Sequence, residues 1–331
     1  MRRRTRTALL VAVAAVLALF GIFLARESGS CFPPAATAAV PWPAAPPESA
    51  IKHVRAGGID FAYVEAGSGP LVLLLHGYPE TPIVWAKAMA ALAGAGYHAV
   101  APYLRGYPPT SAPADGDYSI RAQGGDALAL IAALGAQRAV IVGHDWGASA
   151  GYAAAVRAPD AVEKLVAVSI PHPIALAGDP TVLWKASHFI EYQLPGMVWW
   201  IDTKDLCHVD SIYARWAPGW TPPAVVLDSI KASLRSDSGL RNAFGYYWSF
   251  FSHPPSQPDD LSAQSRIAAP TLVIAGADDG GVDIARYAKA RTGFTGPYEF
   301  VTLQHAGHFP EVEQAEAFNA ALLAFLGPPK P

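Results

Sequence analysis

The pentapeptide from Gly143 to Gly147 constrains the fold of this chain more than any other feature. It reads Gly-His-Asp-Trp-Gly, follows the apolar, β-branched run 139–142 and precedes a small-residue helical pattern over 148–157. The two outer glycines suit a sharp strand-to-helix turn, because neighbouring Cβ atoms would clash there and the central residue lies in strained backbone space. The pattern therefore predicts a strand, a tight elbow and a helix, with Asp145 at the tip of the elbow.

An aspartate at the tip of such an elbow predicts a particular chemistry. A serine alkoxide attacks acyl carbon, whereas a carboxylate suits displacement at saturated carbon and becomes a covalent alkyl ester. Water then hydrolyses that ester. We therefore expect Asp145 to be a nucleophile whose electrophile is an epoxide or an alkyl halide.

Composition places the chain among globular proteins. Of its 331 residues, 52% are hydrophobic and 15% charged, enough for a large core with an accessory region. Five arginines crowd the first 26 residues, and the rest of the chain has 19 basic against 27 acidic residues. An acidic body makes nucleic acid an unsuitable partner. The two cysteines, Cys31 and Cys207, specify no disulfide framework, and both are expected to be free.

The first residues are typical of an export segment. A basic start is followed by Ala8 to Ala25, 18 residues without charge, just long enough to cross a bilayer. Residues 1–26 are expected to be a signal or membrane anchor, and residues 27–50, rich in proline and alanine, a spacer. An uncleaved anchor is favoured, with cleavage near 36–38 as the alternative. Positive charges ahead of the apolar run keep that end in the cytoplasm, so the body is expected in the periplasm or outside the cell.

The body alternates between short apolar strands and helical patterns. Strands are expected at 51–54, 59–64, 71–75, 99–101, 139–142, 165–169 and 271–275, and helices at 83–93, 119–134 and 311–326. This alternation predicts an α/β architecture with a mostly parallel central sheet flanked by helices. From about 171 to 258 the strands stop and the sequence becomes rich in aromatic residues at helical spacing. We expect core segments at 51–172 and 259–331, with an inserted helical cap at 173–258 over the carboxyl edge of the sheet.

Two main-chain donors are predicted beside the nucleophile. The strand 71–75 is followed by His-Gly-Tyr-Pro-Glu at 76–80, a turn in which Tyr78 can aim its N–H inward. The second donor is the N–H of Trp146, directly after the nucleophile. Together they form the expected oxyanion hole for hydrolysis of the ester.

A general base and its orienting acid are expected late in the chain. His308 follows a glycine in the loop before the last helix and is preferred to His305. The acid should follow the strand 271–275, where Asp279 is preferred to its neighbour Asp278. In both pairs the alternative residue stays open.

Seven ordered motifs resemble the α/β-hydrolase superfamily, specifically its epoxide hydrolase and haloalkane dehalogenase branch. They are HGYPE at 76–80, LRGY at 104–107, GHDWG at 143–147, SIPHP at 169–173, YQLPG at 192–196, GYYW at 245–248 and AGHF at 306–309. The resemblance spans about residues 51–326 and implies an α/β-hydrolase fold. It also implies the triad Asp145, His308 and Asp279, with Tyr78 and Trp146 as oxyanion donors.

Opening an epoxide also requires a proton or hydrogen bond for the departing ring oxygen. In epoxide hydrolases two side chains of the cap, commonly tyrosines, take this role. The GYYW segment resembles the site of one, and its register indicates Tyr247, with Tyr246 as the alternative. Counting back from 193–196 leads to His188 in place of the usual tyrosine, while Tyr192 could substitute if the register shifts.

These features predict an epoxide hydrolase that converts a small apolar epoxide and water into a vicinal diol. The alternatives are a haloalkane or haloacid dehalogenase with the same triad and a non-catalytic binding protein of this fold, which would usually have lost a triad residue. No cofactor or metal is expected, because the histidines have no carboxylate or cysteine partners at metal spacing. Arg105 is expected to brace a loop, and His76 and His144 to point away from the reacting carbon.

Overall fold

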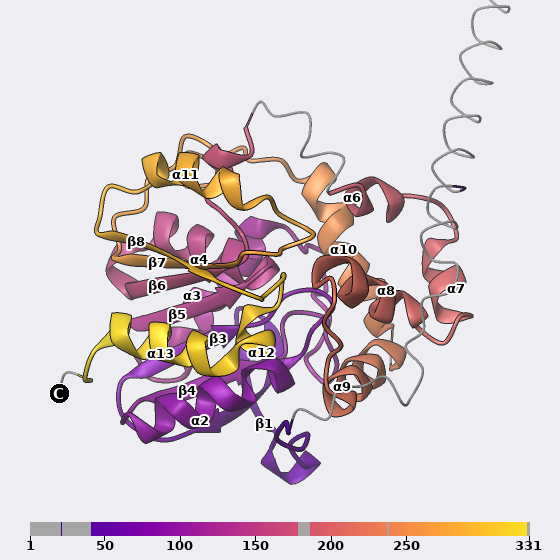
Figure 1. The fold of residues 1–331 in the computed structure, drawn as a ribbon, viewed down its shortest axis with the longest axis horizontal. Helices are drawn as coiled ribbons and strands as arrows, with labels where there is room; N and C mark the ends of the chain where they lie inside the picture. Colours follow the sequence, from indigo (N-terminus) through magenta and orange to yellow (C-terminus); the bar gives the residue numbers. More distant parts are fainter. Residues whose placement is uncertain (1–20, 22–40, 178–185, 237, 330–331) are drawn as a thin grey trace, which may run out of the picture.

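The computed structural model describes residue 21 and residues 41–177, 186–236 and 238–329 (Figure 1). Within them, eight strands form one sheet in the order β1-β2-β4-β3-β5-β6-β7-β8. The strands are β1 (Lys52–Ala56), β2 (Ile59–Ala66), β3 (Leu71–Leu75), β4 (His98–Pro102), β5 (Ala139–His144), β6 (Val162–Val168), β7 (Thr271–Gly276) and β8 (Tyr298–Leu303). Pairing is antiparallel from β1 through β2 to β4 and parallel across the rest of the sheet.

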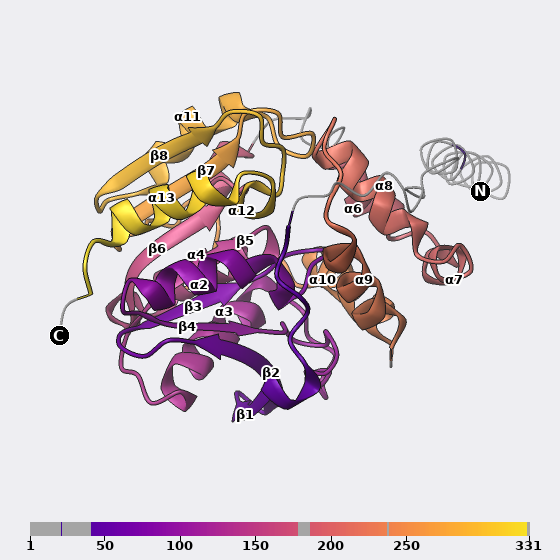
Figure 2. The same ribbon diagram turned by 60° about the horizontal axis from the view of Figure 1, so that its bottom comes forward.

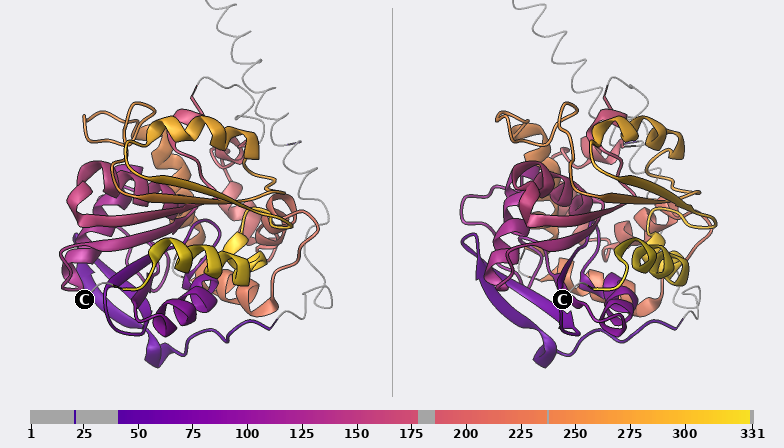
Figure 3. Two further views of the ribbon diagram at one scale, coloured as in Figure 1. Left: turned by 60° about the vertical axis from the view of Figure 1, so that its left-hand side comes forward. Right: turned by 90° about the vertical axis from the view of Figure 1, so that its left-hand side faces the viewer.

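Helices cover both faces of this sheet. They are α2 (Ala86–Gly94), α3 (Ile120–Ala133), α4 (Trp146–Arg157), α11 (Tyr287–Ala290), α12 (Pro310–Glu313) and α13 (Ala315–Leu326). In Figure 1, α2 and α13 pack together in front of the sheet, with α3 and α4 behind it, and Figure 3 shows the same layers from the side. Every residue of β3, β5 and β7 is buried, as expected for central parallel strands that have no polar face.

The predicted fold class is confirmed: the body is an α/β protein with a mostly parallel sheet between helices. The sequence missed β8, whose residues are half exposed apart from Leu303, so its apolar pattern is weak. The predicted last helix is two helices, α12 and α13, separated at Gln314.

Among the described residues between β6 and β7, five α-helices form the cap. They are α6 (His188–Glu191), α7 (Met197–Asp202), α8 (Cys207–Trp216), α9 (Ala224–Arg235) and α10 (Gly239–Ser252). Figure 2 shows them gathered at one end of the sheet. They fall inside residues 173–258, which the sequence assigned to the cap. The part of the chain that the structure describes also has 3-10 turns at Glu48–Ala50, Pro82–Trp85, Pro159–Ala161, Pro173–Ala175, Ile284–Arg286 and Arg291–Gly293.

The predicted anchor, residues 1–26, lies outside the described residues except for residue 21. The described part of the chain has no helix long and apolar enough to cross a membrane. The end of the predicted spacer packs on the core, because the indole Nε1 of Trp42 donates a hydrogen bond to the carbonyl of Ile83 at 3.0 Å. Cys207 is disulfide-bonded, so the expectation of a free thiol there was wrong. Cys31, the other cysteine in the sequence, lies outside the described residues.

Candidate active site

The elbow places Asp145 between β5 and α4 in a strained conformation, with φ of 50° and ψ of −115°. The glycines on either side are required by close backbone contacts. A Cβ on Gly147 would lie 2.1 Å from the carbonyl oxygen of Leu75, and one on Gly143 would lie 2.1 Å from that of Gly147. Because the surrounding backbone fixes this turn, the strain can be held, and the Asp145 side chain projects from the carboxyl end of the sheet.

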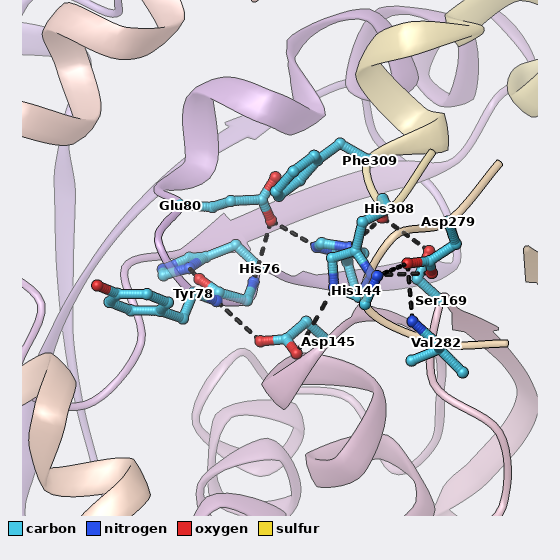
Figure 4. A network of polar contacts seen from close by, with 12 residues as sticks. His76, Tyr78, Glu80, His144, Asp145, Ser169, Asp279, Val282, His308 and Phe309 are labelled. Atoms are coloured by element: carbon cyan, nitrogen blue, oxygen red, sulfur yellow. Dashed lines mark hydrogen bonds and ion pairs between the residues drawn. The ribbon is translucent and has the colours of Figure 1, made fainter. Parts of the chain in front are cut away.

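The loop after β3 approaches the nucleophile directly. The main-chain N–H of Tyr78 donates a hydrogen bond to Oδ1 of Asp145 at 3.0 Å (Figure 4). A Cβ on Gly77 would lie 2.4 Å from the Cβ of Asp145, so only glycine permits this approach. Trp146 is the first residue of α4, a position whose N–H has no acceptor within the helix. The two predicted oxyanion donors therefore belong to the segments that meet at Asp145.

A buried histidine faces the nucleophile from the loop before α12. Nε2 of His308 lies 3.8 Å from Oδ2 of Asp145, and its Nδ1 lies 2.9 Å from Oδ2 of Asp279. Both His308 and Asp279 are buried. The structure thus brings together the three residues predicted as a triad, whereas Asp278 and His305 are exposed.

Asp279 is fixed by the main chain. Its Oδ1 accepts hydrogen bonds from the N–H groups of Gly281 at 2.7 Å and Val282 at 2.9 Å. Its other oxygen remains for the imidazole of His308. An acid held in this way orients the ring and leaves Nε2 directed at Asp145.

The charges of the triad stabilise one another. Burial raises the pKa of Asp145, but the hydrogen bond and charge of His308 outweigh it, so the net pKa lies below the usual value. Burial alone would lower the pKa of His308, yet the charges of Asp279 and Asp145 raise it well above its usual value. Before any reaction, Asp145 is a carboxylate paired with an imidazolium.

Tyr247 and His188, two residues predicted in the cap, lie next to the pair of Asp145 and His308. The ring of Tyr247 on α10 packs edge-on against Trp146 at 5.2 Å and Tyr78 at 5.4 Å between centroids. His188 at the start of α6 lies 5.6 Å from the Tyr247 ring. Burial raises the pKa of Tyr247 well above its usual value, so it keeps its proton. Burial, helped by the charge of Arg215, lowers the pKa of His188 to about 3, so this ring is neutral.

The alternative tyrosines have their hydroxyl groups engaged elsewhere. The hydroxyl of Tyr246 donates to the carbonyl of Arg105 at 2.9 Å. That of Tyr192 lies 2.6 Å from Nε2 of His208, while its ring packs edge-on against Tyr247 at 4.7 Å. Of the tyrosines considered from sequence, Tyr247 is the one whose ring contacts both Trp146 and Tyr78.

Two polar residues near the site brace its loops. Arg105 binds the carboxylate of Asp126 through Nε at 2.5 Å and Nη2 at 2.6 Å, the bracing role expected from sequence. His76 lies 2.9 Å from the carbonyl of Gly77 through Nδ1 and accepts from the N–H of Leu104 through Nε2. Burial lowers the pKa of His76 to about 4, so it is a neutral support for the loop that carries Tyr78.

Sequence reasoning missed a buried cluster beside the triad: Glu80, His144 and Glu311. Nδ1 of His144 lies 2.6 Å from Oε2 of Glu80 and 3.6 Å from Oε1 of Glu311. The three groups are close enough to be considered as metal ligands. However, two ligands of one tetrahedral ion are roughly 3.3 Å apart, so the 2.6 Å contact is a hydrogen bond. Glu80 and His144 stand in motifs quoted above and Glu311 follows the last of them, but no sequence pattern places the two glutamates on one histidine.

Comparisons with known proteins identify the family of this chain. Residues 70–314 match the family model described as the alpha/beta hydrolase fold. Epoxide hydrolase A of Mycobacterium tuberculosis is 31% identical, the match covering 82% of this chain and 96% of that protein. An epoxide hydrolase of Caballeronia sordidicola is 28% identical over 82% of this chain and 92% of its own.

A solved structure extends the likeness to three dimensions. Epoxide hydrolase A from Mycobacterium thermoresistibile superposes with a TM-score of 0.69 and 30% identity, covering 83% of this chain and 97% of that one. The chain belongs to the α/β-hydrolase family and is an epoxide hydrolase-like member of it.

Proposed function

We propose that this protein is an epoxide hydrolase that forms a covalent alkyl ester on Asp145. The relatives described above carry that name. The observation that carries the proposal is the carboxylate of Asp145 in contact with the N–H of Tyr78 and facing Nε2 of His308. A carboxylate at this elbow attacks saturated carbon, and a histidine and acid beside it can then activate water.

In the first step, Asp145 attacks a ring carbon of the epoxide and the carbon–oxygen bond of the ring breaks. The departing oxygen takes the phenolic proton of Tyr247, whose high pKa keeps that proton available. His188 is neutral, so it can add a hydrogen bond without supplying a second proton. The enzyme now holds a hydroxyalkyl ester and a tyrosinate.

Alkylation itself prepares the second step. The ester on Asp145 has no charge, so one of the causes that raise the pKa of His308 disappears. The imidazolium can then pass its proton to the Tyr247 phenolate, and the neutral ring takes a proton from water as the water oxygen attacks the ester carbonyl. The N–H groups of Tyr78 and Trp146 receive the oxyanion. Collapse breaks the ester bond, the departing diol oxygen takes the proton of the new Asp145 carboxyl group, and Asp145, His308 and Tyr247 all return to their starting states.

The test is to stop the reaction between these steps. His308→Gln removes the base, so we expect an ester to accumulate on the peptide that contains Asp145 when the full chain is incubated with apolar epoxides such as styrene oxide. Intact mass should increase by the whole mass of the epoxide. The matched control His308→Gln with Asp145→Ala should show no increase.

Haloalkanes form the second arm of this test. An adduct that has lost its halogen, seen with haloalkanes and with no epoxide, would assign the same residues to dehalogenation. The absence of any adduct, together with an inert wild-type enzyme, would contradict the covalent proposal and favour a binding function.

We also propose that the body of the protein is exported and held near a membrane by its N-terminal segment. The apolar run at 8–25 supports this, and so does the disulfide at Cys207, because disulfides persist in oxidising compartments. Alkylation of the isolated chain before reduction should leave Cys207 unmodified, and alkylation after reduction should modify it. A free thiol on Cys207 in the isolated protein would contradict the proposed oxidising compartment.

A further inference from the structure

Behind the catalytic histidine lies a group of titratable side chains that the reaction above does not use. Glu80, His144 and Glu311 come from the turn after β3, the end of β5 and α12. Their exposed fractions are 0%, 0% and 1%. Three ionisable groups without water need an internal arrangement of protons, because an unpaired buried charge is strongly unfavourable.

The hydrogen bonds of His144 indicate a charged ring. Its Nε2 lies 2.8 Å from the carbonyl oxygen of His308 and its Nδ1 lies 2.6 Å from the carboxylate of Glu80. Both nitrogens face acceptors, the pattern of an imidazolium. Burial alone would lower the pKa of His144, but the charges of Glu311 and Glu80 raise it to about 9.

Glu311, the third member of the cluster, is expected to be neutral, whereas His144 is charged. Both of its carboxyl oxygens are buried without a hydrogen-bond partner among the described residues. Burial, reinforced by the charge of Glu80, raises the pKa of Glu311 well above its usual value. For Glu80, burial raises the pKa, but the charge and hydrogen bond of His144 outweigh it and lower the net value. At neutral pH one carboxyl group is ionised and the other keeps its proton, as two close carboxylates without a second cation require.

The cluster contacts both the turn that carries Tyr78 and the main chain of His308. Among the described residues, the other titratable groups that face the cluster are His76, Asp145 and His308 beside His144, and Tyr213 beside the two glutamates. Glu80 also accepts the N–H of Gly77 at 3.2 Å, in the turn that carries Tyr78. Figure 4 shows Glu80, His144 and His308 side by side. The His144 ring therefore joins the oxyanion turn to the main chain of the catalytic base.

We propose that Glu80, His144 and Glu311 form a proton-holding cluster that positions His308 for ester hydrolysis, an inference that rests on the proposed function. The His144 imidazolium donates one hydrogen bond to the His308 carbonyl and another to the Glu80 carboxylate. Glu311 holds one further proton. Loss of the Glu311 proton adds a negative charge beside His144, which favours the imidazolium. A neutral His144 could donate only one of its two hydrogen bonds, so loss of its proton breaks the link between Glu80 and the His308 carbonyl. All three are positioning residues, because they touch no reacting atom.

The kinetic test compares Glu311→Gln and Glu80→Gln with Ser169→Ala. Ser169 is a matched control because its hydroxyl donates to the same His308 carbonyl at 2.8 Å but has no titration near neutrality. Breakdown of a preformed ester is followed by quenched mass spectrometry from pH 6 to 10. We expect the alkaline decline in breakdown rate to move to lower pH by about one unit in both glutamine variants. Alkylation should stay within about threefold of wild type.

Ser169→Ala should slow ester breakdown without moving its pH profile. Equal displacement of the profile by all three variants, or no displacement by the glutamine variants, would overturn the proposal. If His308→Gln forms no ester, the proposed function fails instead, and the following measurements, which need no substrate, still test the cluster.

Stability provides the first independent measurement. The pKa of Glu311 is raised in the folded state, so its contribution to stability is complete below the unfolded pKa and is lost as pH rises toward the folded pKa. Glutamine has the same shape and no titration. We expect the Tm of Glu311→Gln to exceed that of wild type at pH 7 and to match it near pH 4.5. A lower Tm at both pH values would contradict a stored proton.

NMR of the histidine ring nitrogens in the wild-type chain provides the second independent measurement. We expect His144 to show two protonated nitrogens at pH 7. A neutral ring there would overturn the proposal even if the variants failed to fold.

Discussion

The core and the cap fix their catalytic residues in different ways. In the core, main-chain hydrogen bonds hold Asp279, and Tyr78 meets Asp145 through its own N–H. In the cap, Tyr247 and His188 are held mainly by ring packing, with centroids of 4.9 Å between His188 and Trp216. Main-chain bonds specify direction to within a narrow range, whereas aromatic contacts tolerate other rings of similar size.

In the proposed reaction, the core and the cap serve different steps. The core would supply the nucleophile and the water-activating pair, which determine the kind of bond that is made and broken. The cap would supply the group that protonates the departing oxygen, and so would determine which leaving group is served. Core variants should therefore abolish steps, and cap variants should change the rate of the first step or its substrate.

The largest effect is expected from the nucleophile. Asp145→Ala should reduce turnover of an apolar epoxide by more than about 10⁴-fold, because no other residue can form the ester. The variant should also form no adduct by intact mass. Its Tm should stay close to that of wild type, since the strained φ of 50° at this position is imposed by the neighbouring backbone. Residual turnover within 100-fold of wild type would indicate direct attack by water.

The next effect tests the orienting acid against its neighbour. Asp279→Asn should slow ester breakdown by roughly 10²–10⁴-fold, because His308 loses the carboxylate that sets its tautomer. Asp278→Asn is the matched control and should change breakdown by less than about twofold, since that side chain is exposed. Stopped-flow or quenched mass measurements of ester decay distinguish the two. Equal losses would mean that the loop, and not one carboxylate, is responsible.

Sequence predicted the core better than the cap for a physical reason. The elbow at Asp145 follows from local constraints, two glycines between a strand and a helix, and these are visible in a short window. His308 and Asp279 follow from their order relative to the strands. Tyr247 could be separated from Tyr246 only by seeing which ring packs on Trp146 and Tyr78 and that the Tyr246 hydroxyl donates to Arg105, because adjacent helical residues differ by about 100° in direction. The partnership of Glu80 with Glu311 depends on contacts across 231 positions of sequence, which no local pattern contains.

A smaller effect is expected from the proposed proton donor in the cap. Tyr247→Phe should slow alkylation by roughly 10–10²-fold with epoxides, because the departing oxygen loses its proton donor. Ester breakdown should be nearly unchanged, since the core performs that step. Tyr246→Phe is the matched control: it loses a hydrogen bond to Arg105 and should alter stability more than alkylation. A larger alkylation defect in Tyr246→Phe would exchange the two roles.

The smallest effect is expected at His188, and it shows what kind of help the cap gives. Burial lowers the pKa of His188 to about 3, so the ring stays neutral throughout pH 5–8 and can donate a hydrogen bond but holds no extra proton. His188→Gln keeps a donor and should slow alkylation by about threefold, whereas His188→Phe keeps the ring and should slow it by about tenfold. Neither change should move the pH profile of alkylation between pH 5 and 8. If the glutamine variant removed an ionisation near pH 6.5, His188 would be a general acid. The cap would then contain a second group that transfers a proton, and not one that only donates a hydrogen bond.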